Sequence, residues 1–322
     1  MIKIGVIGTG NMGKNHVRIL SEERTNFKLA AIYDANAETA ASFSRKYRVK
    51  AAESVDELLD SVDAAVIAVP SSLHYEIALK AAAKGVNALV EKPLTLDFDD
   101  AQRIDEAFRS AGKVLMVGHV ERYNPVVMEL QNILCNEKMV AVDIHRCSPY
   151  SPRISDADVI SDLMIHDIDI LCNGLGCGTI RRLSAQGNIV VSGDKLDYVQ
   201  ALIEFENGVM GSITASRITE DKIRTLDIHA KNGFIHADLL THNLQISRRT
   251  SYTHEPNQTQ LYKQESIVEK VMVPSFEPLR KELLTFADCI QNGAEPVTGG
   301  KPSAYAIRVA SAIREAALKG KG

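Results

Sequence analysis

The sequence predicts an α/β protein of two domains: a parallel-sheet domain at the N-terminus, then an α+β domain with a large, mostly antiparallel open sheet. Strand and helix patterns alternate through Gly118, whereas most later segments resemble strands joined by hairpin turns. The length of 322 residues also fits two domains of roughly 100–200 residues each. We expect a first domain at 1–119 and a second at 120–322, with the last helix, about 304–319, a candidate to pack back on the first domain.

Alternating apolar strands and amphipathic helices predict the elements of the first domain. Ser54 is placed to cap a short helix, with Glu57 at the capping-box position, and Gly85 marks a helix end. Strand, helix, strand at this spacing predicts βαβ units and a parallel sheet, whose strands end along one ligand-binding edge. The predicted strands are 3–8, 28–33, 64–69, 86–91 and 114–117, and the predicted helices are 11–21, 37–47, 54–59, 74–84 and 98–110.

Hairpin spacing predicts the second domain. The turn sequences ENGVMG at 206–211 and AKNGF at 230–234 each join two strand-like segments, which indicates antiparallel pairing. A polar stretch at 250–269 predicts a long loop or excursion. The predicted strands are 140–146, 180–186, 198–205, 209–215, 224–230, 233–238 and 244–247, and the predicted helices are 125–134, 163–171, 279–291 and 304–319.

Composition limits the classes of function. A net charge of -4 gives no broad cationic surface, so neither nucleic acid nor a membrane is an expected partner. No apolar run approaches the roughly 20 residues that span a bilayer, and the N-terminus enters a strand pattern without a signal peptide. The five cysteines form no CxxC pair and are expected to be reduced, packed thiols. These features predict a cytoplasmic protein.

A glycine-rich turn follows the first predicted strand. Gly8, Gly10 and Gly13 have the GxGxxG spacing. Gly8 permits a tight turn after the strand, Gly10 lets the pyrophosphate approach closely, and Gly13 lets the helix pack close to the sheet. Asn11 and Met12 lie at the start of the following helix, where free N–H groups and the helix dipole favour phosphate. Because the turn joins a strand to a helix, it predicts a dinucleotide-binding Rossmann domain, with these five residues in the cofactor site.

A carboxylate ends the second predicted strand. Asp34 stands about 20 residues beyond the turn, where it can accept hydrogen bonds from ribose hydroxyls and repel a 2′-phosphate. NAD is therefore expected rather than NADP, and a helix N-cap is the alternative role for Asp34. After the third strand, Pro70 and Ser71 lie at the ligand-binding edge. His74 is assigned to the cofactor site too, with a cap or packing role as its alternative.

The sequence EKP ends the fourth predicted strand at the same edge. Glu91 and Lys92 are therefore assigned to the cofactor site as well. Lys92 by itself is also compatible with a solvated surface charge. Pro93 predicts a fixed turn, with a cis peptide bond as an option, that aims the lysine.

The segment SDLMIHDIDIL at 161–171 predicts a helix with clustered polar groups. Asp162 and His166 are four residues apart and share a face, and Asp169 lies on nearly the same face. A carboxylate one turn from a histidine can fix its tautomer and raise its basicity. A plain surface pair and a divalent-metal site of these three residues are the alternatives. No HExxH or CxxC spacing supports the metal, and none is expected.

These features together resemble the glucose–fructose oxidoreductase, inositol dehydrogenase and rhizopine-catabolism family, called Gfo/Idh/MocA. The resemblance covers the whole chain, through the GxGxxG turn, EKP, VGHVERYNP at 117–125 and the DxxxH helix. It implies an NAD-dependent dehydrogenase acting on CH–OH groups, and a homo-oligomer, dimer or tetramer, formed through the C-terminal sheet. It implies that Lys92, Asp162 and His166 are catalytic. His166 would then be the general base, Lys92 would stabilise the developing alkoxide, and Asp162 would orient the substrate.

Within the family, GHVERYNP and DLMIHDIDIL resemble members that oxidise the C3 hydroxyl of UDP-N-acetylglucosamine. This implies a sugar-nucleotide substrate and functional coupling to an aminotransferase that converts the 3-keto product into the 3-amino sugar of lipid A. For Arg122, pairing with the diphosphate and a structural ion pair both stay open, and His119 either lies near the nicotinamide or holds the strand end. The residues expected to contact the substrate are His119, Glu121, Arg122, Tyr123, Asn124, Arg146 and Arg153.

Two other functions stay open from the sequence. The first is a dehydrogenase for inositol, another sugar or a UDP-hexuronic acid, whose carboxylate would need a further basic partner. The second is a non-enzymatic, cofactor-sensing regulator. Such a regulator would be free to lose Lys92, Asp162 and His166, yet all three are present.

Overall fold

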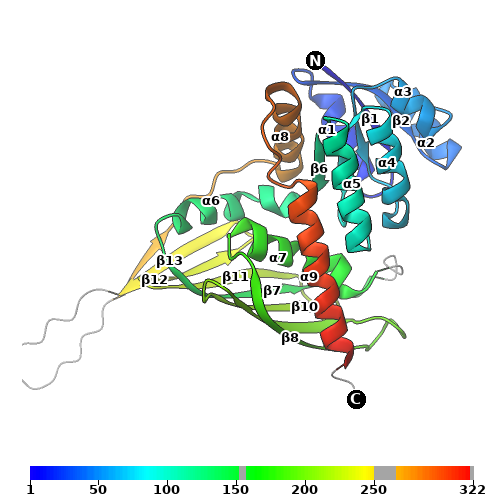
Figure 1. Cartoon of the computed structure of the whole chain (residues 1–322). Coiled ribbons are helices and arrows are strands. Elements are labelled where there is room, and N and C mark those ends of the chain that lie inside the picture. Colours follow the sequence, from blue (N-terminus) through cyan, green and yellow to red (C-terminus); the bar gives the residue numbers. More distant parts are fainter. Residues whose placement is uncertain (152–156, 250–265, 320–322) are drawn as a thin grey trace, which may run out of the picture. The chain divides into compact units, whose positions relative to one another are not determined.

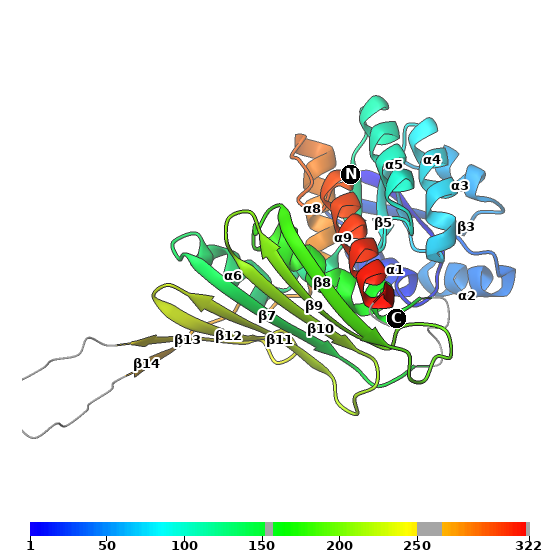
Figure 2. The ribbon, with the colours of Figure 1, turned by 60° about the horizontal axis from the view of Figure 1, so that its bottom comes forward.

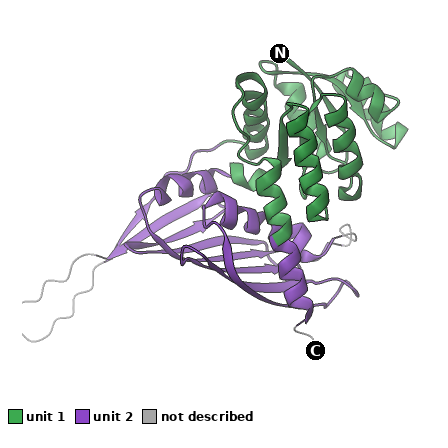
Figure 3. Ribbon diagram, in the orientation of Figure 1, with its two compact units in different colours: residues 1–123, 276–308 green, residues 124–275, 309–322 purple. Residues whose placement is uncertain are grey.

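The computed structural model describes residues 1–151, 157–249 and 266–319, and it divides into two compact units. Unit 1 comprises Met1–Tyr123 and Phe276–Arg308, and unit 2 comprises Asn124–Ser275 and Val309–Gly322 (Figures 1 and 3). The first segment of unit 1 ends a few residues beyond the predicted boundary at 119. The chain returns to unit 1 at Phe276, which the sequence did not predict. It passes back to unit 2 at Val309, so helix α9 (Gly300–Lys319) is divided between the units.

Unit 1 contains a six-stranded parallel sheet with the order β3-β2-β1-β4-β5-β6. This is the strand order of the dinucleotide-binding Rossmann fold, which the glycine-rich turn predicts. The order reverses between β1 and β4, and ligands of such sheets bind outside the carboxyl ends of the strands at this point. The strands are β1 (Ile2–Ile7), β2 (Phe27–Tyr33), β3 (Lys50–Ala51), β4 (Ala64–Ile67), β5 (Asn87–Glu91) and β6 (Leu115–Gly118).

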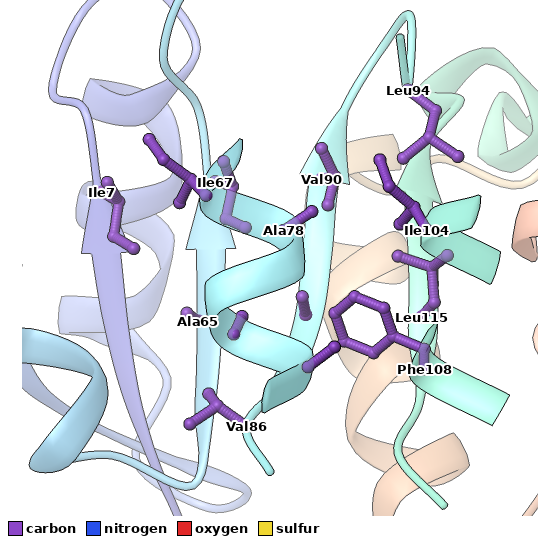
Figure 4. Packing of buried hydrophobic residues seen from close by; sticks show 14 of the residues in the cluster. Ile7, Ala65, Ile67, Ala78, Val86, Val90, Leu94, Ile104, Phe108 and Leu115 are labelled. Atoms are coloured by element: carbon purple, nitrogen blue, oxygen red, sulfur yellow. The ribbon is translucent and has the colours of Figure 1, made fainter. Parts of the chain in front are cut away.

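Helices bury apolar side chains on both faces of this sheet. On one face, Ala78 of α4 lies among Ile67 and Val90 of the strands, with Phe108 of α5 beside them (Figure 4). On the other face, the core includes Leu283 and its neighbours on α8, whose apolar positions repeat at helical spacing. This burial explains why the chain returns to unit 1. The helices are α1 (Gly13–Glu22), α2 (Ala37–Tyr47), α3 (Val55–Asp60), η1 (Ser71–Leu73), α4 (His74–Ala83), α5 (Phe98–Ser110), η2 (Val120–Tyr123) and α8 (Pro278–Asn292).

Unit 2 contains an eight-stranded sheet with the order β14-β13-β12-β11-β7-β10-β9-β8 (Figure 2). All neighbouring strands pair antiparallel except β7 and β10, which run parallel, so the predicted mostly antiparallel sheet is confirmed. The strands are β7 (Met139–Cys147), β8 (Ile180–Asn188), β9 (Tyr198–Phe205), β10 (Met210–Ser216), β11 (Ile223–Ala230), β12 (Gly233–Asp238), β13 (Asn243–Arg249) and β14 (Ser266–Lys270).

Helical segments lie on one face of the second sheet (Figure 1). Helix α6 (Pro125–Leu134) begins at the Asn124 cap and has Pro125 in its first turn, the position that proline favours. The helix predicted at 163–171 is longer in the structure. Its central turn, α7 (Ile165–Asp169), is flanked by two π-helical turns, η3 (Ile160–Met164) and η4 (Ile170–Gly174). None of the described helices is both long and apolar enough to cross a membrane.

Strand β14 corrects the loop predicted at 250–269. Ser266–Lys270 pairs antiparallel with β13 at the edge of the sheet. All five of its side chains are exposed, so backbone pairing alone holds the strand in place. The sequence therefore shows no alternation of buried and exposed residues that would predict it. The rest of the predicted loop, 250–265, lies outside the described residues.

Candidate functional site

The three glycines of the turn have different surroundings. Gly8 has a positive φ of 88°, and a Cβ there would lie 2.6 Å from the carbonyl oxygen of Ala68. A Cβ on Gly13 would lie 1.9 Å from the carbonyl oxygen of Gly8. Both positions are therefore restricted to glycine by the fold itself. A Cβ on Gly10 would meet nothing within 4 Å, so the described protein leaves open space there, which fits the close approach of a dinucleotide pyrophosphate.

Asp34 is fixed by the glycine-rich turn. Its Oδ2 accepts hydrogen bonds from the backbone N–H and the hydroxyl of Thr9, at 2.8 and 2.6 Å, and its Oδ1 accepts one from the N–H of Asn36 at 2.9 Å. Burial alone would raise the pKa of Asp34, but these bonds outweigh it and lower the pKa. The carboxylate is thus ionised and oriented, as an acceptor for ribose hydroxyls must be. Thr9 is not among the predicted site residues, although it stands inside the GxGxxG sequence.

Other predicted cofactor residues gather where β1 and β4 end. These two strands are neighbours at the switch point of the sheet. Asn11 is exposed and Met12 half-buried at the N-terminus of α1, and Pro70 is exposed and Ser71 half-buried after β4. The free N–H groups of the first turn of α1 favour a phosphate here. The residues at this edge therefore fit the pyrophosphate and ribose of NAD.

His74 makes its contacts inside the protein. Its exposed fraction is 1%, its Nδ1 lies 2.8 Å from the carbonyl oxygen of Pro93, and its Nε2 lies 3.0 Å from that of Val69. Burial lowers the pKa of His74, because a cation inside the protein is poorly solvated. A neutral ring carries one N–H and donates to one of the two carbonyl oxygens. This is the packing role that the sequence left open for His74.

The EKP segment ends β5, and its Lys92–Pro93 peptide bond is cis. Lys92 is half-buried, whereas Glu91 is buried and its Oε1 lies 2.8 Å from Nε2 of His16 on α1. Glu282 of α8 is fully buried, and neither of its carboxyl oxygens bonds to a described residue. Burial, and then the charge of Glu91, raise the pKa of Glu282 well above its ordinary value. Neither His16 nor Glu282 is among the site residues predicted from the sequence.

The predicted catalytic helix presents two polar side chains and buries two others. Asp162 and His166 are half-buried, and Asp167 and Asp169 are buried. Asp169 accepts a hydrogen bond from the Asn173 amide at 2.9 Å. Asp169 therefore differs in environment from the pair with which the sequence grouped it. The described residues hold no group of three histidine, cysteine or acidic side chains arranged for a metal ion.

Arg146 of β7 binds this helix from the sheet. Its Nε lies 2.9 Å from both carboxylate oxygens of Asp167, and a terminal nitrogen lies 2.8 Å from Oδ1. The side chains of the pair are 2% and 1% exposed. Arg146 thus forms a buried ion pair with Asp167, the residue after His166. This structural position differs from the substrate contact predicted for Arg146, and Arg153 lies outside the described residues.

The start of the same helix has a second arginine anchor. Nε of Arg314 on α9 lies 2.6 Å from Oδ2 of Asp158, and a terminal nitrogen lies 2.7 Å from the hydroxyl of Ser161. Asp158 also accepts the N–H of Ser161 at 2.9 Å. Burial opposes ionisation of Asp158, but Arg314 outweighs it and lowers the pKa of the carboxyl. Two arginine–aspartate pairs therefore fix the helix before Asp162 and after His166.

The ERYNP segment at 121–125 is buried. Asn124 caps α6 by accepting the N–H of Val126 at 3.0 Å, and its amide donates to the carbonyl oxygen of Leu239 at 3.3 Å. Burial raises the pKa of the Tyr123 hydroxyl, which therefore stays protonated. Asn124 caps the helix and Tyr123 packs in the core of unit 1, and the substrate contacts predicted for both stay predictions. The predicted substrate contacts of His119, Glu121 and Arg122, which are 2%, 8% and 6% exposed, stay predictions.

Comparisons with known proteins match both units. The family described as "Oxidoreductase family, NAD-binding Rossmann fold" matches residues 2–119, and the "GFO/IDH/MocA C-terminal domain" matches residues 140–236. A UDP-N-acetylglucosamine 3-dehydrogenase from Acidithiobacillus ferrooxidans is 33% identical over 252 residues, which cover 78% of this chain and 79% of the relative. The solved structure of that enzyme aligns with a TM-score of 0.89 at 30% identity, covering 98% of this chain and 97% of the other.

More distant relatives differ in the substrates of their names. The scyllo-inositol 2-dehydrogenase (NAD(+)) of Bacillus subtilis is 26% identical over 323 residues, which cover 92% of this chain and 88% of the relative. A levoglucosan dehydrogenase crystallised with NADH aligns with a TM-score of 0.83 at 20% identity, covering 99% of this chain and 97% of that one, and at this identity the likeness concerns the fold.

Proposed function

The chain belongs to the Gfo/Idh/MocA oxidoreductase family and is an NAD-dependent dehydrogenase, and from this premise we propose that it oxidises the C3 hydroxyl of UDP-N-acetylglucosamine to a ketone. The observation that carries the proposal is the 33% identity with the enzyme of that activity across 79% of its length. The scyllo-inositol 2-dehydrogenase of Bacillus subtilis, matched over 92% of this chain, is 26% identical. An inositol or other sugar is the second candidate substrate, and the non-enzymatic alternative is set aside.

The proposed mechanism uses three side chains. When bound, NAD⁺ supplies the hydride acceptor. His166 accepts the hydroxyl proton as the carbon–hydrogen bond breaks, since a histidine titrates nearest neutral pH. Lys92 donates a hydrogen bond to the same oxygen and stabilises its developing negative charge. Asp162, one turn before His166, orients the substrate. All three side chains are half-buried, which supports this assignment. Each is partly accessible to a substrate, while the turn or helix that carries it is held by buried contacts.

The cellular setting belongs to the proposal as well. A 3-keto sugar nucleotide is less stable than its alcohol, so an aminotransferase that consumes it, as in 3-amino sugar synthesis for lipid A, would draw the reaction forward. A cytoplasmic location would give both enzymes access to the same pool. We also expect a homo-oligomer through the second sheet, whose outer face exposes apolar side chains such as Leu202 and Met210.

A coupled assay tests the substrate and the base together. Purified protein receives NAD⁺ and UDP-N-acetylglucosamine, with glutamate and a partner aminotransferase, and NADH is followed by absorbance. We expect NADH formation that falls about 10²–10⁴-fold in His166→Ala and is kept in His145→Ala, a matched change of an exposed histidine in unit 2. NADH from inositols or hexuronates alone would instead establish the second candidate.

A further inference from the structure

Two buried histidines contact the EKP turn at its two ends. His16 on α1 contacts Glu91, and His74 at the start of α4 contacts Pro93. Their exposed fractions are 0% and 1%. Both histidines and the turn belong to unit 1, and the proposed mechanism uses neither histidine.

The first contact fixes the residue before Lys92. Nε2 of His16 lies 2.8 Å from Oε1 of Glu91, while Nδ1 of His16 has no hydrogen-bond partner within the part of the chain that the structure describes. On the other side, a Cβ on Gly118 would lie 3.0 Å from Oε2 of Glu91, so β6 closely borders this carboxylate. The Glu91 side chain is therefore enclosed between α1 and β6, with His16 at its Oε1, and its Oε2 accepts the backbone N–H of Lys92 itself at 3.3 Å.

The second contact fixes the residue after Lys92. Nδ1 of His74 lies 2.8 Å from the carbonyl oxygen of Pro93, and Nε2 lies 3.0 Å from that of Val69. Val69 follows β4, the neighbour of β5 in the sheet. His74 thus lies between the backbone beyond Lys92 and the end of the adjacent strand, and its single N–H donates to Pro93 when Nδ1 carries it.

We propose that His16 and His74 are positioning residues that hold the backbone on both sides of Lys92 and thereby direct its ammonium group at the reacting oxygen. The proposal rests on the catalytic role proposed for Lys92. A lysine side chain is long and flexible, so its reach depends on where its backbone is held. A misplacement of about 1 Å at a reacting group can cost about 100-fold in rate.

Amide substitutions separate this anchoring from simple packing. The side-chain N–H of Gln reaches about as far as Nε2 of histidine, and that of Asn about as far as Nδ1. His16→Gln therefore keeps the donor to Glu91, whereas His16→Asn loses it. At position 74 the order reverses for the tautomer that carries its N–H on Nδ1, since His74→Asn then keeps the donor to Pro93 and His74→Gln loses it. Packing volume by itself would favour Gln at both buried positions.

The four variants are compared with the wild-type chain by kcat, KM, the Kd for NAD⁺ and melting temperature. A further readout is the pH dependence of Lys92 acetylation by acetic anhydride, measured by mass spectrometry. We expect His16→Asn and His74→Gln to lower kcat about 10–100-fold with KM and Kd nearly unchanged, and to shift the pH midpoint of Lys92 acetylation. His16→Gln and His74→Asn should restore most of kcat and the wild-type midpoint.

Two results would overturn the proposal. One is that the same amide, Gln or Asn, gives the higher kcat at both positions, and that kcat follows melting temperature among the four variants. The other is unchanged Lys92 acetylation in every variant. Acetylation needs no sugar substrate, so a wild-type protein inactive toward UDP-N-acetylglucosamine would refute the proposed function and still leave the positioning role open to this comparison.

Discussion

Replacing Arg146 by Met should destabilise unit 2 and slow the reaction together. The substitution removes two hydrogen bonds of 2.9 Å and an ion-pair contact of 2.8 Å, and it leaves the Asp167 carboxylate buried without its arginine. Breaking a buried ion pair by removing one partner costs about 3–5 kcal/mol. At about 2–4 °C per kcal/mol for a unit of this size, the melting temperature should fall by about 6–20 °C. Because His166 precedes Asp167, kcat should fall as well.

The paired substitution Arg146→Met with Asp167→Leu provides the control. Replacing both members of a buried ion pair by apolar groups is often neutral or stabilising, so the double variant should regain most of the lost melting temperature. Thermal unfolding by calorimetry measures this, and steady-state kinetics at a permissive temperature gives kcat and KM. An Arg146→Met variant that melts like wild type and only raises KM for the sugar nucleotide would contradict this structural role. The guanidinium would then hold substrate, as the sequence analysis predicts.

Three further predictions concern unit 1. Asp34→Ala should raise the Kd for NAD⁺ about 10–100-fold and reduce the preference over NADP⁺, because a charged ribose acceptor is lost; binding titrations with both cofactors check this. Gly10→Val should weaken NAD⁺ binding without lowering melting temperature, whereas Gly13→Ala should lower both, since its Cβ would lie 1.9 Å from a carbonyl oxygen. The pKa of Glu282 is raised by folding, so the folded chain keeps a proton that the unfolded chain releases above its ordinary pKa of 4.5. Stability therefore falls as pH rises past that value, and Glu282→Gln should melt higher than wild type at pH 8 but not near pH 4.

The fold class was predictable because its signals are local. The alternation of strands and helices, the glycine turn and the hairpin turns are each made by residues that lie close together in the sequence. Strands β3 and β14 escaped prediction because the first has two residues and the second buries no side chain. The return of α8 to unit 1 also escaped it, since an apolar helical stripe does not specify which sheet it covers.

Residues of the candidate site could be proposed from the sequence where they lie at strand ends or share a helix face. Lys92 follows a strand, and Asp162 and His166 are one turn apart. The groups that hold them come from distant positions: His16 and Glu91 are 75 residues apart, and Asp158 and Arg314 are 156 apart. Only the folded arrangement selects such partners, because each is an ordinary charged or polar residue in its own helix or strand.

The fate of the hydrogen at C3 distinguishes oxidation at this carbon from every other reading of the chemistry. UDP-N-acetylglucosamine carrying deuterium at C3 is incubated with the protein and NAD⁺, and the NADH formed is analysed by mass spectrometry. We expect NADH that carries the deuterium and a slower reaction than with the unlabelled substrate. NADH without deuterium would mean that another carbon is oxidised, and no NADH from this substrate would mean that the substrate itself is wrong.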